Sequence, residues 1–418
     1  MLNNKFLNEY SARILSAGLK LGGLAGKLVL IFFMANFLAP EAVGLYGLVL
    51  ATVTFMTYVV GFDYYKYSTR EVITCEVSER FPVIRDSYVL YAMMFVILSP
   101  LIAFFFKYGT LPWNVFPWLI VILFVEHFSQ EANRFLIALR MQLFASLVFF
   151  IRSGFWAIIA IFLMFMFKGI RTVNFVFFAW AVGGGLSCIF SLIVIYSLKK
   201  HSHVRPINWG WMKKGVIVAA PFLLATVALR STLAFDKYAV DYMGGAEVLA
   251  AYVFFFGVSS TIISIVDSLV FMFVYPDLVR LYKDREFNLF KAAYKKMLLQ
   301  CIMASISLAV FIGMALTFLV EGLSYESYSN HIIFLYLSLL AMILFCISMV
   351  PHYALYAMNR DRDIIINHIF GFFVFCFFVA IVIVFGNFYQ IPLALVFSFS
   401  YMAVSKFLIL KKKESLVF

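Results

Sequence analysis

The sequence predicts an all-α integral membrane protein with about twelve transmembrane helices. Of its 418 residues, 64% are hydrophobic and only 13% are charged, and the mean hydropathy is +0.98. A soluble domain carries charge on about a quarter of its residues. Most of this chain therefore meets lipid rather than water, and its structural unit is a helix bundle.

The individual spans follow from the length of each apolar run. A helix needs about 20 largely apolar residues to cross the hydrocarbon core of a bilayer. By that rule the spans lie near residues 13–37, 42–62, 87–106, 116–139, 142–167, 173–198, 215–235, 246–275, 297–320, 331–357, 363–386 and 390–410. An even number of spans places both termini on the same side of the membrane.

The Lys and Arg residues predict which side that is, because cytoplasmic loops carry an excess of both. Of the 33 Lys and Arg residues, 24 lie in one alternating set of loops and tails, and the other set holds only Lys107, Lys168, Arg171 and Lys237. We therefore expect both termini and the loops at 63–86, 199–214 and 277–296 in the cytoplasm. The net charge of +12 reflects this topology and does not indicate a nucleic-acid partner.

The sequence carries no pattern for a cofactor or a metal. The five cysteines are scattered, and no pair has the spacing of a metal or redox site. There is no Gly-rich ATP-binding pattern and no loop long enough to hold a soluble catalytic domain. We predict a chain without a cofactor, a metal site or an enzymatic activity.

A weak internal repeat divides the spans into six and six. Glu41, Gly44 and Tyr46 open the second span, and Glu247, Ala250 and Tyr252 open the eighth, an offset of 206 residues. Repeats of this kind build the two halves of many transporters. We expect an N-terminal six-helix lobe over residues 1–205 and a C-terminal one over 206–418.

Basic residues at bilayer depth are the strongest pointers to function, because they are costly there and usually face a polar cavity. Lys20 and Lys27 lie in the first span, Arg152 lies near the middle of the fifth, and Arg230 lies in the outer half of the seventh. We predict that these four cations bind substrate. Snorkelling to the interface is an equal alternative for Lys20, and it is the interpretation that we favour for Lys406 in the last span.

Three glycines of the first span recur every fourth residue, at Gly18, Gly22 and Gly26. Small residues at this spacing let two membrane helices approach closely. The first span should therefore pack one tight face on a neighbouring helix.

Acidic and titratable residues gather in the fourth span, at Glu126, His127 and Glu131, and we predict that they form one polar strip. They could relay protons, because the pKa of His lies near neutrality and burial can raise the pKa of a Glu towards the same range. With equal weight, they could instead balance the basic residues of the first and fifth spans. Asp267, deep in the eighth span, is either a counter-ion or a coupling site.

Several segments resemble a known family. They are residues 36–47 (NFLAPEAVGLYG), residues 61–63 (GFD) followed by Arg70 and Glu71, residues 235–238 (FDKY), and residues 244–252. The chain resembles the repeat-unit flippases of bacterial surface polysaccharide synthesis, the Wzx type. These belong to the superfamily that includes the multidrug and toxin extrusion (MATE) transporters and the lipid II flippases. The likeness covers the whole chain.

The resemblance implies a cavity between two lobes that opens to each side in turn, in a bacterial inner membrane. It also implies a cargo, an O-antigen or capsule oligosaccharide on undecaprenyl diphosphate that moves to the outer leaflet. Candidate protein partners are a polysaccharide polymerase and a chain-length regulator. The residues suit that cargo, since Lys27, Arg152 and Arg230 would offset the desolvation of a diphosphate.

Two other functions compete with this one. A drug or cation antiporter of the same superfamily would use Glu126, Glu131 or Asp267 as its cation sites. A polysaccharide polymerase or lipid-dependent glycosyltransferase would need catalytic groups outside the membrane, usually on a large external loop. No external loop here is large enough, so the enzyme is the poorest of the three.

Overall fold

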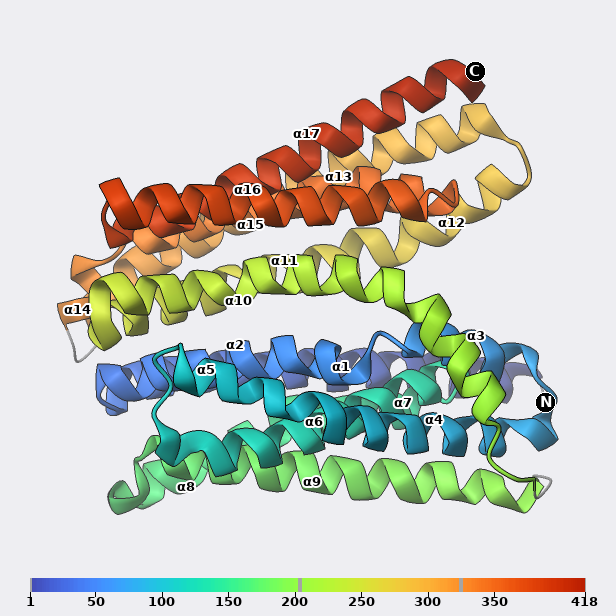
Figure 1. The fold of residues 1–418 in the computed structure, drawn as a ribbon, viewed down its shortest axis with the longest axis horizontal. Helices are drawn as coiled ribbons and strands as arrows, with labels where there is room; N and C mark the ends of the chain where they lie inside the picture. The colour runs from blue at the N-terminus through green and yellow to red at the C-terminus, as the bar shows by residue number, and fades with distance from the viewer. Residues whose placement is uncertain (1, 202–204, 323–325, 418) are drawn as a thin grey trace. The chain divides into compact units, whose positions relative to one another are not determined.

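The computed structural model describes residues 2–201, 205–322 and 326–417, and every regular element in these residues is a helix (Figure 1). The α-helices are α1 (Leu2–Phe37), α2 (Pro40–Gly61), α3 (Tyr65–Thr74), α4 (Val77–Leu98), α5 (Ala103–Lys107), α6 (Phe116–Ala138), α7 (Gln142–Phe150), α8 (Trp156–Met166), α9 (Val173–Ser197), α10 (Trp209–Ser259), α11 (Thr261–Val266), α12 (Met272–Lys283), α13 (Phe287–Leu319), α14 (Glu326–Asn330), α15 (Ile333–Ala357), α16 (Asp361–Phe385) and α17 (Ile391–Val417). Two π-helical turns, η3 (Ile151–Phe155) and η6 (Asp267–Phe271), interrupt membrane helices, and short 3₁₀ turns link several of the others.

Eleven described segments are long and apolar enough to cross a membrane. One of them, Trp209–Lys283, has 75 residues, which as a single helix would measure about 110 Å. Its backbone leaves the helix at Gly245, where φ is 76° and ψ is −179°, a conformation open to glycine alone. Across this break the hydroxyl of Tyr252 donates to the carboxylate of Asp236, so the two stretches lie side by side. The segment therefore supplies two crossings, and the predicted multi-span helical fold is confirmed.

Most spans begin and end close to their predicted limits, but two begin ten residues early. The first ten residues of Val77–Lys107 and of Phe287–Gly322, nearly three helical turns, include several charged side chains, which a rule based on apolar length leaves out. These charged residues continue the membrane helix at its polar end instead of forming a separate loop.

By their packing, the helices form two compact units. The first contains Met1–Leu38 and Val49–Leu223, and the second contains Ala39–Leu48 and Leu224–Phe418. The repeat in the sequence divides the chain between residues 205 and 206. In the structure, two helices are divided between the units. The start of α2, up to Leu48, belongs to the second unit and its remainder to the first, whereas the start of α10, up to Leu223, belongs to the first unit and its remainder to the second.

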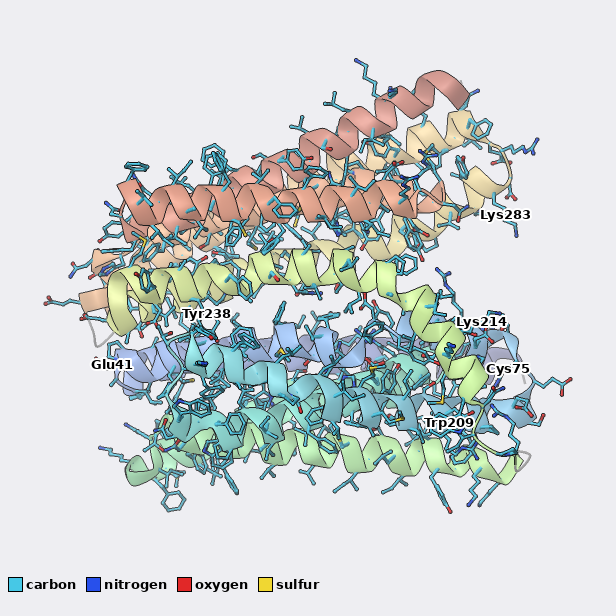
Figure 2. All side chains as sticks on the ribbon, viewed as in Figure 1. Glu41, Cys75, Trp209, Lys214, Tyr238 and Lys283 are labelled. Carbon is cyan, nitrogen blue, oxygen red and sulfur yellow. The ribbon has the colours of Figure 1, made fainter. Side chains whose placement is uncertain are left out.

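In the first unit, α1 packs against α7, η3 and α8, and α6 packs against α9 and α7 (Figure 1). Residues of the predicted cytoplasmic loops gather at one end of this unit, where Figure 2 shows Cys75, Trp209 and Lys214. Successive helices that cross a membrane in opposite directions place every second loop on the same side, and the common end of these residues agrees with that arrangement.

In the second unit, α15 packs against α17 and α13, and α16 packs against α17. The two copies of the sequence repeat meet here: a Cβ placed on Gly44 would lie 2.9 Å from the carbonyl oxygen of Ala246, and one placed on Gly47 would overlap Val253. The repeat therefore forms a close helix contact that only small residues permit. Figure 2 shows Glu41 and Tyr238 at one end of this unit and Lys283 at the other.

Candidate functional site

Arg152 lies on the π-helical turn η3, inside the fifth membrane crossing. Its Nη1 atom lies 3.2 Å from a carboxylate oxygen of Glu126 and 3.2 Å from the side-chain oxygen of Gln130, both on α6. Its buried Nε atom has no hydrogen-bond partner among the described residues. Arg152 is thus paired on one side and retains an unused donor on the other.

Glu126 links three elements of the first unit. Its second carboxylate oxygen accepts a hydrogen bond of 2.6 Å from the indole Nε1 of Trp180 on α9. The Trp180 ring stacks on Trp156 of α8, with 5.8 Å between centroids and 6° between planes. Both oxygens of this buried carboxylate therefore have partners, as a buried charge requires.

Lys27 completes this cluster from α1. Its Nζ atom lies 5.7 Å from the centre of the Trp180 ring, and it is close enough to Glu126 and Arg152 for the three charges to interact. Lys27 makes no ion pair within 4.0 Å in the part of the chain that the structure describes. Two cations, Lys27 and Arg152, thus lie near a single carboxylate that pairs with Arg152, and with all three groups ionised the cluster carries one net positive charge.

Glycines hold α1 against the π-helical turn. A Cβ on Gly26 would lie 2.8 Å from the carbonyl oxygen of Gly154, and one on Gly22 would lie 3.3 Å from the ring of Phe150. The predicted tight face of the first span is confirmed at these two residues. It does not extend to Gly18, where a Cβ would meet nothing within 4 Å.

The predicted polar strip of α6 divides between two faces of the helix. Glu126 and Gln130 contact Arg152 of η3. His127 instead contacts Tyr91 of α4, and Glu131 pairs with Arg134 of its own helix. Neighbouring residues of a helix point about 100° apart, which is enough to separate the two pairs. The expectation of one continuous strip is therefore wrong, although each pair four residues apart does share a face.

The second face forms a closed polar site. Glu131 pairs with Arg134, whose guanidinium carbon lies 3.5 Å from the centre of the Tyr65 ring. The buried ring of His127 meets Tyr91 edge to face at 5.3 Å. Neither ring nitrogen has a hydrogen-bond partner of standard geometry among the described residues, although the backbone of Thr57 lies close. Glu131 is thus already neutralised by a cation of its own helix.

The remaining predicted cations do not join the cluster around Glu126 within the first unit. Lys20 is exposed, almost two helical turns before Lys27. Arg230 is half-buried on α10, in the second unit, and the buried carboxylate that follows it, Asp236, is paired with Lys237. The shared cargo site of Lys27, Arg152 and Arg230 remains a prediction.

No family model matches the sequence, and no curated protein matches it. Solved structures do match. An inward-facing multidrug resistance MATE family transporter of the MOP superfamily has a TM-score of 0.78 at 14% identity, over 97% of this chain and 98% of that one. This chain has a MATE-like transporter fold. An outward-facing MATE transporter gives a TM-score of 0.66 at 15% identity, over 97% and 96% of the two chains. A MOP superfamily transporter from Pyrococcus furiosus gives 0.64 at 14%, over 97% and 96%.

Asp267 of this MATE-like chain lies on the other π-helical turn, η6, in the second unit. Its side chain is exposed and accepts a hydrogen bond of 3.2 Å from the hydroxyl of Tyr353 on α15. π-Helical turns inside α-helices are frequently found at functional sites. Each of the two in the described residues carries one of the predicted charges, Arg152 in η3 and Asp267 in η6.

The sequence reasoning missed a buried basic group in the second unit of the MATE-like fold. Lys406 on α17 is 1% exposed, so it does not snorkel to an interface as predicted. Its Nζ atom lies 3.4 Å from Nε2 of His368 on α16, whose ring stacks on His352 of α15. Three consecutive helices meet here, and the spacing of His352, His368 and Lys406 along the chain does not reveal that their side chains come together.

Proposed function

We propose that this chain is a flippase that moves an oligosaccharide linked to a polyprenyl diphosphate from the cytoplasmic to the outer leaflet of a bacterial inner membrane. It would do so by alternating access, with both termini in the cytoplasm. The observation that carries the proposal is the charge of the cluster in the first unit, where Lys27 and Arg152 lie near one carboxylate, that of Glu126, which pairs with Arg152.

A diphosphate suits this cluster chemically. Lys27 has no ion-pair partner among the described residues, and Arg152 retains a buried Nε–H without a protein acceptor. Guanidinium donors match phosphate oxygens in pairs, whereas an ammonium acts as a point charge. Glu126 would keep Arg152 in place before cargo arrives and limit the cost of an otherwise unpaired cation.

The comparisons support a transporter but leave its cargo open. Two of the similar structures are multidrug resistance transporters. In the Pyrococcus furiosus transporter, by contrast, the reverse polarity of the binding pocket suggests a different function for that protein. Polarity is therefore a reasonable guide to cargo within this fold. If the polarity of the site indicates the charge of the cargo, the net positive cluster of Lys27, Arg152 and Glu126 favours an anionic cargo.

Export of cationic drugs is the second candidate. Its support is the exposed carboxylate of Asp267, together with the multidrug transporters among the similar structures. Glu126 and Glu131 give it less support, because each is already paired with an arginine in the described structure.

Reconstitution separates the two functions. Proteoliposomes containing the purified chain would be given a fluorescent polyprenyl diphosphate disaccharide or, in parallel, ethidium. We expect movement of the lipid, its loss in Arg152→Ala and its partial return in Arg152→Lys, which restores the charge without the paired donors. Lys168→Ala, at an exposed lysine of the same unit, is the control. Export of ethidium that depends on Asp267, with no movement of the lipid, would favour the drug exporter.

The pair with Glu126 needs its own control, because Arg152→Ala also leaves a carboxylate without its arginine. A protein that merely needs the pair for folding would recover both its folded yield and its transport in the double variant Glu126→Gln/Arg152→Ala. Normal lipid movement by that double variant would contradict a cargo role for Arg152. Recovery of folding without transport is the result that we expect.

A further inference from the structure

The second unit contains a string of titratable side chains that the cargo site does not use. It runs from Asp267 on η6 through Tyr353 and His352 on α15 to His368 on α16 and Lys406 on α17. The hydroxyl of Tyr353 lies 3.2 Å from Asp267, and its ring centre lies 5.7 Å from that of His352. The rings of His352 and His368 stack with 5.5 Å between centroids and 2° between planes.

The two ends of this string differ in exposure. Asp267 is exposed, whereas Lys406 is 1% and His368 is 6% exposed. Among the described residues, the Nζ atom of Lys406 has two polar partners, Nε2 of His368 at 3.4 Å and the carbonyl oxygen of Ser348 at 3.5 Å. Within the residues that the structure describes, no carboxylate pairs with Lys406.

The geometry of the buried end suits one proton. If Lys406 is an ammonium, the carbonyl of Ser348 and an unprotonated Nε2 of His368 both accept from it. If the proton lies on His368 instead, its Nε2–H donates to the neutral amine with the same positions of the heavy atoms. A second proton would place two cations 3.4 Å apart in a buried site, which is strongly unfavourable.

Other titratable groups line the same helices. Tyr275 on α12 lies with its ring centre 5.0 Å from that of Tyr353, and the buried Cys346 of α15 lies near Asp267 and near Cys301 of α13. These are neutral groups at physiological pH. The only carboxylate in the string is thus Asp267, at the exposed end.

We propose that Lys406 and His368 form a proton-binding site, and that transport by this chain is coupled to the proton bound there. Tyr353 and His352 lie between this buried site and Asp267, the exposed end of the string. The coupling rests on the proposed transport function, whereas the binding of the proton does not. Binding adds one positive charge between three helices and strengthens the contact of α17 with Ser348 and His368. Release of the proton weakens the same contact.

The proton site lies in line with two other polar contacts between α16 and α17. The hydroxyl of Ser398 donates to the carbonyl of Gly371 at 2.8 Å, and the side-chain amide of Asn367 donates to the carbonyl of Met402 at 3.3 Å. Lys406 follows Ser398 and Met402 at intervals of four residues. Ser398→Ala therefore removes a neutral contact from the same helix pair, which makes it a matched structural control.

The binding of the proton is tested without any cargo. The chain, labelled with ¹³C at histidine Cε1, would be placed in lipid nanodiscs and titrated by NMR, with His331 as an internal reference and His368→Gln to assign the signal. We expect the His368 signal to titrate between about pH 5 and pH 8 and its midpoint to shift in Lys406→Met but not in Ser398→Ala. A His368 signal that does not titrate, or whose midpoint ignores Lys406→Met, would overturn the site.

The coupling is tested in proteoliposomes that hold a pH-sensitive dye, with the fluorescent polyprenyl diphosphate disaccharide and with ethidium as cargo. The wild-type chain should move protons with its cargo, and a proton gradient should accelerate transport. Lys406→Met, His368→Gln and Lys406→Arg, whose arginine cannot release its proton, should lose both effects, while Ser398→Ala and Lys411→Met keep them. Gradient-driven transport by the Lys406 variants would refute the coupling, and transport of ethidium alone would refute only the proposed cargo.

Discussion

The contact between α1 and the π-helical turn makes a sharp prediction at Gly26. In Gly26→Ala the new methyl group would lie 2.8 Å from the carbonyl oxygen and 2.9 Å from Cα of Gly154. Both atoms belong to the backbone, so no side chain can rotate away. Ordinary contact begins at 3.4 Å, and the two helices would therefore have to separate by about 0.6 Å.

Gly18→Ala is the matched control, because it makes the same chemical change on the same helix where nothing lies within 4 Å. Replacing glycine by alanine stabilises a helix by about 0.5–1 kcal/mol, and this gain is common to both variants. Their difference therefore isolates the packing penalty, which we expect to be about 1–3 kcal/mol.

Unfolding in SDS mixed micelles, followed by tryptophan fluorescence, measures that difference. All six tryptophans lie at or before Trp211, so they report on the first unit, which contains Gly26. Because Lys27 follows Gly26 directly, Gly26→Ala should also slow transport, whereas Gly18→Ala should not. Equal stability of the two variants would mean that these glycines do not seat α1 on the fifth crossing.

Three further predictions concern charges elsewhere in the chain. Asp86 is fully buried and accepts from Arg205 at 2.8 Å, so Asp86→Asn should destabilise the first unit by about 1–3 kcal/mol in the same tryptophan assay; an unchanged unfolding curve would contradict this role. Tyr252→Phe removes a 2.5 Å bond to a buried carboxylate, and it should speed hydrogen exchange in α10, while unaltered exchange would argue against that bond. A cysteine placed at the exposed Lys107, in a cysteine-free background, should react with an impermeant thiol reagent from outside, and one at the exposed Lys283 should not, whereas the reverse pattern would invert the topology.

The sequence was sufficient for the fold because the bilayer fixes the length of each crossing. Every apolar run of the required length became a helix, and the largest extensions of a membrane span beyond its predicted limits are the partly charged first ten residues of Val77–Lys107 and Phe287–Gly322. The close packing of the first span at Gly22 and Gly26 could also be predicted, because it depends on the spacing of small residues along one helix.

The sites were less predictable, because they depend on which helices meet. The pair of Arg152 with Glu126 was one of two open alternatives, and nothing in the spacing of 26 residues decides between them. The burial of Lys406 was predicted wrongly, since the depth along the last span resembles that of a snorkelling lysine. Its partner His368, 38 residues earlier, becomes visible only when α16 and α17 lie side by side.

The two π-helical turns connect the fold to both proposed sites. A π-helical turn inserts a residue and turns the rest of the helix by about 100°, so the residues before and after it can face different neighbours. In η3, this lets Arg152 meet α6 while Gly154 lies against α1. In η6, Asp267 is held at an exposed position beside Tyr353. Such turns give up regular backbone bonding, and a charge in the middle of a membrane helix is itself costly. That each turn holds a charge, Arg152 in η3 and Asp267 in η6, is therefore an argument that both proposed sites are functional.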